Sequence, residues 1–181
     1  MRFKRTRRGV EAKVDAVEAQ VLAQCATELL ELLGESEESS DDPLAALVGL
    51  PPGEVTKPDD PALARLFPDA YGDDAAAAKE FRRYTESDLR AGKRAAASDA
   101  LLSLHPLIAG GGRLVLDRDQ VDVWLAWLND IRLVLGTRLD VTEDSYEEDP
   151  EDQLSAVYSW LGWLQESLLS CVDPRPQVGP Q

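Results

Sequence analysis

A run of apolar residues near the carboxyl end, spaced at alternating steps of three and four, limits the possible folds more than any other feature of the chain. Its members are Leu154, Val157, Leu161, Leu164, Leu168 and Cys171. This spacing places all of them on one face of a helix, which has to be buried against another element. Asp149 is a candidate N-cap for this helix, with Pro150 at the first helical position. A long amphipathic helix is therefore predicted at the carboxyl end.

Two other stretches carry the start signal of a helix. Asp15 stands three residues before Glu18, and Asp117 stands three residues before Gln120. In this capping box each side chain accepts a hydrogen bond from the other residue's backbone N–H. The predicted helices end at Gly34 and Gly136. Their predicted apolar faces consist of Val17, Val21, Cys25, Leu29 and Leu32 in the first, and Val121, Trp124, Leu128, Ile131 and Leu135 in the second.

Short strands are predicted before both of these helices. Residues 10–14 alternate between apolar and charged and follow Gly9, which predicts a hairpin with the segment around Phe3. The sequence RLVL at 113–116 predicts another strand that joins it. Residues 73–104 predict one long helix or a broken pair, and Asp-Pro at 42–43 and 60–61 predicts two short helices. The predicted fold is mainly α, a helical bundle with a small amino-terminal β-hairpin or short sheet.

The length of 181 residues suggests one domain, which we assign to residues 1–172. The acidic segments 35–42 and 143–149 are predicted to be solvated, mobile loops. The proline-rich tail, residues 173–181, is predicted to be disordered.

The composition argues against several classes of protein. No apolar stretch follows the basic amino end as in a signal peptide, and no run is long enough to span a membrane, so we expect a cytoplasmic protein. Two cysteines and one histidine, His105, are too few for a structural zinc site. His105 lies outside any recognisable nucleophile motif. We expect neither a cofactor nor a metal, and no enzymatic activity.

Positive charge is concentrated in two places, although the net charge is −15. One is the amino end, with Arg2, Lys4, Arg5, Arg7 and Arg8. The other is the strip FRRYTESDLRAGKR at 81–94, whose candidate docking residues are Arg82, Arg83, Arg90, Lys93 and Arg94. Three interpretations of the strip are open: docking of a protein partner, charge balance within the molecule, and contact with DNA. The pI near 4.4 opposes the long-range attraction on which phosphate binding relies, so any contact with DNA is expected to be indirect.

The two cysteines, Cys25 and Cys171, lie on apolar faces of the first and last long helices. Either they are buried thiols that behave as small hydrophobic residues, or they approach closely enough to form a disulfide. A disulfide needs alpha carbons about 5.5–6 Å apart.

The tryptophans form two pairs at spacing three, Trp124 with Trp127 and Trp160 with Trp163. Such pairs are typical of a core or an interface between helices rather than of a cofactor site. We therefore expect the two helices to pack on each other, and an oligomer interface is an open possibility.

Several strings resemble those of a known family: FKRTRRG, DPALARLFPDAY, EFRRYTESDLRAGKR, WLAWLNDIRLVLGTRL and VYSWLGWLQESLL. In this order they are similar to the actinobacterial oxidative-stress regulators called AosR, a family long known only as a domain of unknown function. The resemblance extends from Phe3 to about Cys171.

The resemblance implies a cytoplasmic transcriptional regulator that forms an intramolecular disulfide on oxidation and acts through the transcription machinery, with a sigma factor as the candidate partner. The redox role then falls on Cys25 and Cys171, since the chain has no other thiol. The rival interpretation is a non-catalytic adaptor or oligomeric interaction protein whose buried cysteines are inert.

Overall fold

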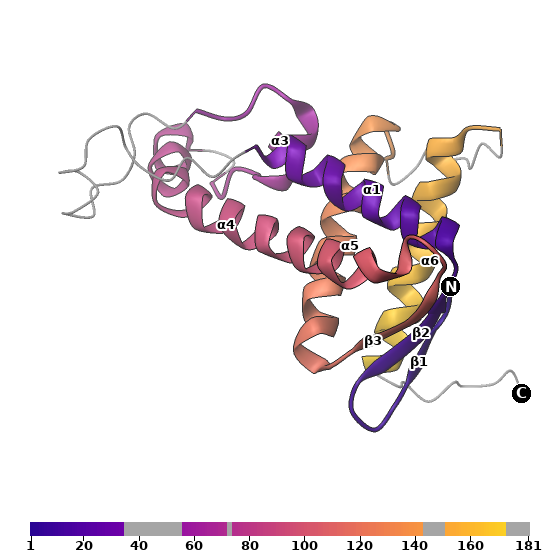
Figure 1. Ribbon diagram of the computed structural model, residues 1–181. Coiled ribbons are helices and arrows are strands. Elements are labelled where there is room, and N and C mark those ends of the chain that lie inside the picture. Colours follow the sequence, from indigo (N-terminus) through magenta and orange to yellow (C-terminus); the bar gives the residue numbers. More distant parts are fainter. Residues whose placement is uncertain (35–55, 72–73, 143–150, 173–181) are drawn as a thin grey trace, which may run out of the picture.

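A computed structural model describes residues 1–34, 56–71, 74–142 and 151–172 (Figure 1). In chain order the elements are β1 (Phe3–Arg5), β2 (Val10–Val14), α1 (Ala16–Leu33), α3 (Pro61–Leu66), α4 (Ala75–Leu104), the 3-10 turn η1 (His105–Leu107), β3 (Gly112–Leu116), α5 (Arg118–Arg138) and α6 (Gln153–Val172). The protein is mainly α with a small sheet, so the predicted fold class is confirmed. The predicted loops at 35–42 and 143–149, the tail and the first Asp-Pro helix lie outside the described residues.

The sheet has three antiparallel strands in the order β1-β2-β3. Ala12 in the central strand faces Phe3 on one side and Leu114 on the other. These three side chains are buried, whereas Lys4, Lys13 and Arg113 point to the opposite face and are exposed. The alternation of apolar and charged residues therefore gives the sheet one face in the core and one face in solvent.

Both predicted capping boxes are present. Glu18 N–H donates to the Asp15 carboxylate at 2.8 Å, and Gln120 N–H donates to the Asp117 carboxylate at 2.9 Å. Each box satisfies backbone donors that the first helical turn leaves without partners. Because Asp15 follows β2 and Asp117 follows β3 directly, each strand passes into its helix without a loop.

The long helices pack in two pairs. α1 and α4 lie side by side, and α5 and α6 lie side by side across them, with α6 also running along β1 (Figure 1). α4 is one helix of 30 residues that continues through Gly92, so the long-helix prediction is confirmed over the broken pair. α3 is the second Asp-Pro helix, and its cap Asp60 accepts hydrogen bonds from two backbone N–H groups as predicted.

Helix faces and ends differ from the predictions in three places. In α1 the buried face consists of Ala19, Leu22, Ala23, Cys25, Ala26, Leu29 and Leu33, while Val17 is exposed. The alanines are small enough to allow α4 close to this face, which the pattern of larger residues did not reveal. α5 runs past Gly136 to Arg138. α6 begins at Gln153, where the Asp152 carboxylate accepts from Leu154 N–H and Ser155 N–H; the predicted cap Asp149 lies outside the described residues.

The core joins the inner face of the sheet to all four long helices. All five apolar residues predicted for the face of α5 are buried, as are Leu161, Leu164 and Leu168 of α6. Among the described residues, the helices include none that is long and apolar enough to cross a membrane.

Candidate functional site

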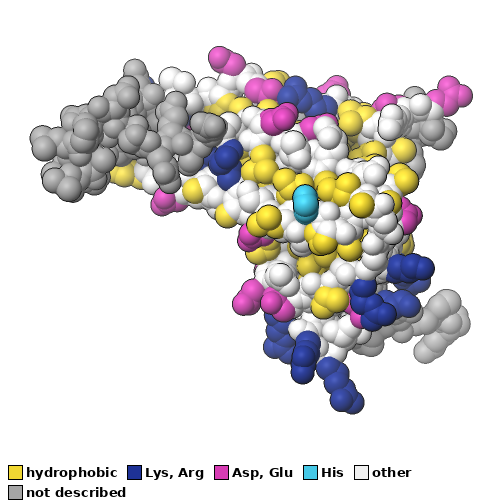
Figure 2. Space-filling model, in the orientation of Figure 1, with side chains coloured by type: hydrophobic (Ala, Val, Ile, Leu, Met, Phe, Trp, Pro, Cys, Tyr) yellow, Lys and Arg dark blue, Asp and Glu magenta, His cyan; other side chains and the backbone are white. Residues whose placement is uncertain are grey.

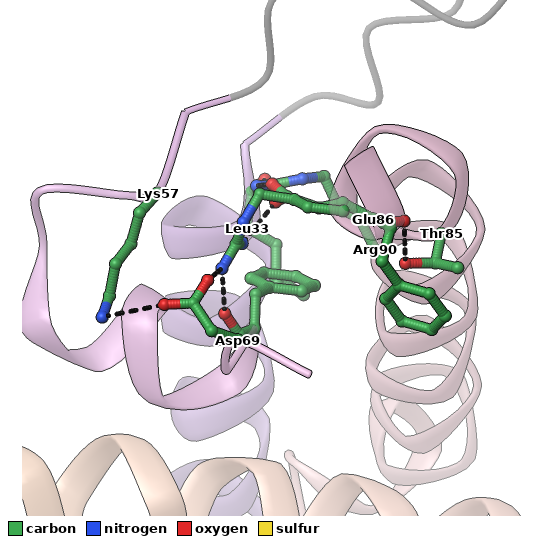
Figure 3. A network of polar contacts seen from close by, with 9 residues as sticks. Leu33, Lys57, Asp69, Thr85, Glu86 and Arg90 are labelled. Atoms are coloured by element: carbon green, nitrogen blue, oxygen red, sulfur yellow. Dashed lines mark hydrogen bonds and ion pairs between the residues drawn. The ribbon is translucent and has the colours of Figure 1, made fainter. Parts of the chain in front are cut away.

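Most of the basic strip on α4 is bound within the fold. Arg82 is 6% exposed and donates to the Glu86 carboxylate at 2.7 Å, the Asp69 carboxylate at 2.8 Å and the Phe67 carbonyl at 2.9 Å. Lys57 also contacts Asp69, at 3.3 Å (Figure 3). Hydrogen bonds from Arg82 and Lys57 lower the pKa of the Asp69 carboxyl. This cluster ties the segment after α3 to α4.

Two arginines of the strip bind the end of α1. Arg90 donates to the Leu33 carbonyl at 2.6 Å and to the Glu86 carboxylate at 2.7 Å (Figure 3). Arg94 donates to the carbonyls of Leu30 and Gly34. The last carbonyls of a helix have no partners within it and carry partial negative charge, so these guanidinium groups stabilise that end.

Lys93 joins α4 to α5 through an ion pair with Asp130, in which the charged atoms are 2.6 Å apart. Asp130 is 4% exposed. Burial raises the pKa of its carboxyl, and the hydrogen bond and charge of Lys93 partly offset that rise.

Arg83 is exposed and lies 6.0 Å from the ring centroid of Tyr84. The internal partners of Arg82, Arg90, Lys93 and Arg94 favour charge balance within the molecule as the role of the strip. The spacing of four between Arg82, Glu86 and Arg90 predicts the pairs with Glu86, which are present. Sequence reasoning missed the other partners because they lie on other elements.

The two cysteines are free thiols at separate places in the fold. Cys171 lies at the end of α6 beside the β1–β2 hairpin, where it helps to line a groove of about 950 Å³ with Arg5, Arg7 and Arg118. Cys25 lies in the middle of α1, which leads away from the opposite end of β2 (Figure 1). A strand of the length of β2 spans about 13 Å, so the described conformation keeps the thiols unbridged.

The thiols also differ in their surroundings. Burial raises the pKa of the Cys25 thiol to about 11, and the nearby charge of Glu28 adds to the rise. Because the thiolate is the reactive form, Cys25 is protected from oxidants in this conformation. Cys171 Sγ donates to the Ser167 carbonyl at 3.4 Å, and its side chain forms part of the groove wall.

The four tryptophans do not form one interface. Trp124 and Trp127 are fully buried in an edge-to-face pair with ring centroids 5.1 Å apart. Trp160 packs at the edge of the core, whereas Trp163 is 46% exposed. Trp163 lines a second groove, of about 880 Å³, on the outer face of the sheet. Of the four, Trp163 is therefore the one best placed to meet a partner.

No cluster of His, Cys, Asp and Glu suited to a metal ion occurs in the part of the chain that the structure describes.

Comparison with known proteins places the chain in a family. Residues 1–172 match the family model described as "Domain of unknown function (DUF2017)". The chain belongs to this family. Its relatives include the "Oxidative stress regulator AosR" of Mycobacterium tuberculosis strain H37Rv and that of Mycobacterium bovis. Each is 33% identical in an alignment over 170 residues that covers 84% of this chain and 77% of the relative. A protein of Mycobacterium leprae is 35% identical over the same share of both chains. No solved structure matches the chain.

These matches confirm the resemblance to AosR that the sequence strings indicated. Family relatives are named as regulators of oxidative stress, which supports a regulatory role for this member.

Proposed function

We propose that this protein is a cytoplasmic, non-catalytic regulator of transcription that responds to oxidants through its two thiols and acts on a protein of the transcription machinery, with a sigma factor as the candidate. The observation that carries the proposal is the identity of 33% to AosR proteins across most of both chains. The names of these relatives connect the family to oxidative stress. The two thiols are the groups that an oxidant would modify.

The proposed switch is a disulfide between Cys25 and Cys171. Peroxide oxidises the Cys171 thiol to a sulfenic acid and releases water, and the Cys25 thiol then displaces a second water as the S–S bond forms. Both thiols are buried, Cys25 at 8% and Cys171 at 9% exposure. Cys171 reacts first because it lines a groove, whereas the pKa of the Cys25 thiol is raised to about 11.

Formation of this bond requires a change of conformation. The end of α6 has to leave the hairpin before Cys171 can reach Cys25, since the bond needs alpha carbons about 5.5–6 Å apart. The oxidised protein therefore differs from the described one in the region of α6 and β1, and that difference is the signal.

Peptide mass spectrometry of the reduced protein before and after mild peroxide tests the switch. We expect a Cys25–Cys171 cross-linked peptide that a reductant removes. Cys25→Ser should stop at a sulfenic acid on Cys171, which dimedone traps, and Cys171→Ser should not react. Binding of purified sigma factors to both redox states then tests the partner.

The adaptor interpretation is favoured by the burial of both thiols and by the raised pKa of Cys25. It expects both thiols to stay free under peroxide and the oligomeric state to stay unchanged. That result would refute the switch.

A further inference from the structure

A second set of basic residues, on the sheet and around it, is exposed. We call it the basic sheet surface. All of its members are exposed: Arg2, Lys4, Lys13 and Arg113 around the groove on the outer face of the sheet, Arg5, Arg7 and Arg118 around the groove beside Cys171, and Arg8 in the hairpin turn. Figure 2 shows Lys and Arg side chains gathered around the β1–β2 hairpin, at the lower end of that view. The pairing of β3 with β2 adds Arg113 to the basic amino end, and Arg118 at the start of α5 lies at the same groove as Arg5 and Arg7.

Within the described residues, little of the positive charge on this surface is paired. Among the described residues, one ion pair involves it: Arg113 contacts Glu11 across the sheet at 3.1 Å, and Arg113 is 71% exposed. The seven other members have no ion pair within that part of the chain. On α4, by contrast, Arg82, Arg90 and Lys93 all have carboxylate partners. Seven of the eight cations on and around the sheet thus have no ion pair among the described residues, in a protein of net charge −15.

The surface also contains an apolar anchor point. Trp163 of α6 stands at the rim of the sheet, and the groove on the outer face is lined by Trp163 together with Arg2, Lys4, Lys13 and Arg113. An exposed indole among arginines has the composition of the residues that contribute most to protein interfaces.

We propose that the basic sheet surface binds an acidic, extended segment of a partner protein, with an apolar side chain of that segment against Trp163. This proposal identifies the surface through which the protein would act. It rests on the proposed function only in the assumption that the protein acts through a partner. Complementary charge steers such a segment to the sheet, and the indole adds the contact that holds it.

The charge distribution favours a protein segment over a nucleic acid. A short acidic segment stays within the basic sheet surface, where its charges meet cations at close range. A nucleic acid carries its charge far beyond the point of contact, and the remainder of this protein is strongly acidic. Glu11 lies within the sheet face as well, which places a carboxylate among the cations.

The test uses the full chain, kept reduced, and a short fluorescein-labelled peptide of Asp and Glu around a central Phe. Fluorescence anisotropy gives the affinity. Lys13→Glu should weaken binding roughly tenfold, the effect of losing about two favourable charge contacts. The new carboxylate would face Arg113 across the sheet, so this variant replaces a pair of like charges by a pair of opposite charges and should fold.

Matched controls separate the site from general effects. Arg65→Glu makes the same change of charge at an exposed residue of α3 and should leave the affinity within about twofold. Trp163→Ala should weaken binding without changing the charge, whereas Leu169→Ala, at a similarly exposed residue of the same helix, should not. Circular dichroism checks the fold of each variant.

Three results would overturn the proposal. Equal losses from Lys13→Glu and Arg65→Glu would mean that net charge alone attracts the peptide. Tighter binding of single-stranded or duplex DNA, weakened by Lys13→Glu, would assign the surface to nucleic acid. Self-association that Lys13→Glu abolishes would assign it to a second copy of the chain. The binding test uses no oxidant. Absence of the disulfide switch would therefore not change its result, and absence of peptide binding would not argue against the switch.

Discussion

Replacement of Lys93 by methionine isolates the ion pair that joins α4 to α5. Methionine keeps the aliphatic length of the side chain and removes its charge. Among the described residues Lys93 is the one cation that contacts the Asp130 carboxylate, which is 4% exposed, so the variant leaves this buried carboxylate without an ion pair there. Loss of one partner from a buried pair costs about 3–5 kcal/mol of unfolding free energy. Lys93 is itself 21% exposed, so water screens the pair and we expect about 3 kcal/mol at pH 8.

The cost should depend on pH, with a direction set by Asp130. Burial raises the pKa of this carboxyl above 3.8 even with Lys93 in place, so the folded protein holds that proton more tightly than the unfolded chain does. The contribution of Asp130 to stability therefore falls as pH rises above 3.8. Without Lys93 the pKa rises further, so the difference between variant and wild type grows with pH and becomes constant once both carboxyls are ionised.

Urea unfolding at several pH values measures this. A loss of about 3 kcal/mol lowers the midpoint by roughly 1.5 M for a slope near 2 kcal/mol/M. The double variant Lys93→Met with Asp130→Asn removes the buried charge and should recover a large part of the loss. A cost below about 1 kcal/mol at pH 8, or one that is equal at pH 5 and pH 8, would refute the interpretation of Lys93 as a residue that holds the fold.

Three further outcomes are expected. Gly9→Ala should cost more than about 3 kcal/mol in thermal unfolding, because an added Cβ would lie 2.0 Å from the Leu116 carbonyl oxygen; normal stability would refute the close approach of the hairpin to β3. Asp117→Ala should cost about 1 kcal/mol in the same assay, since it removes the capping box of α5. Native Cys25 should react with iodoacetamide at pH 7.5 at least about 100-fold more slowly than a free thiol, given a pKa of about 11 instead of 9.0, and a rate like that of the urea-unfolded chain would contradict it.

Signals carried by a few neighbouring residues predicted the local structure correctly. The capping boxes at Asp15 and Asp117 depend on two residues three positions apart, and both formed. The face of α5 was correct because its members are large and evenly spaced. The face of α1 was predicted less well, since alanines between the larger residues allow more than one helix face to be buried.

The role of the charges depended on residues far apart in sequence. Lys93 meets Asp130, which is 37 positions away, and Arg90 meets the Leu33 carbonyl at a separation of 57. Nothing in the strip itself distinguishes a cation bound to the protein from one that faces solvent. For the sheet, the alternation of the two predicted strands contained a usable signal: it places Lys13 and Arg113 on the solvent face, and pairing of the strands makes them neighbours.

The two proposals concern adjoining parts of the molecule, which leads to one more prediction. The groove beside Cys171 is lined by Arg5, Arg7 and Arg118, three members of the basic sheet surface. Phe3 N–H also donates to the Ser167 hydroxyl of α6 at 3.2 Å, so α6 supports the edge strand of the sheet. If oxidation draws the end of α6 away, this support is lost and the surface is less well ordered for a partner. Loss of one such hydrogen bond corresponds to about a 3- to 10-fold fall in peptide affinity. Anisotropy with the peptide, before and after peroxide, measures it in wild type and in Cys171→Ser. Equal affinities of the reduced and oxidised wild type would mean that the thiols and the basic sheet surface work independently.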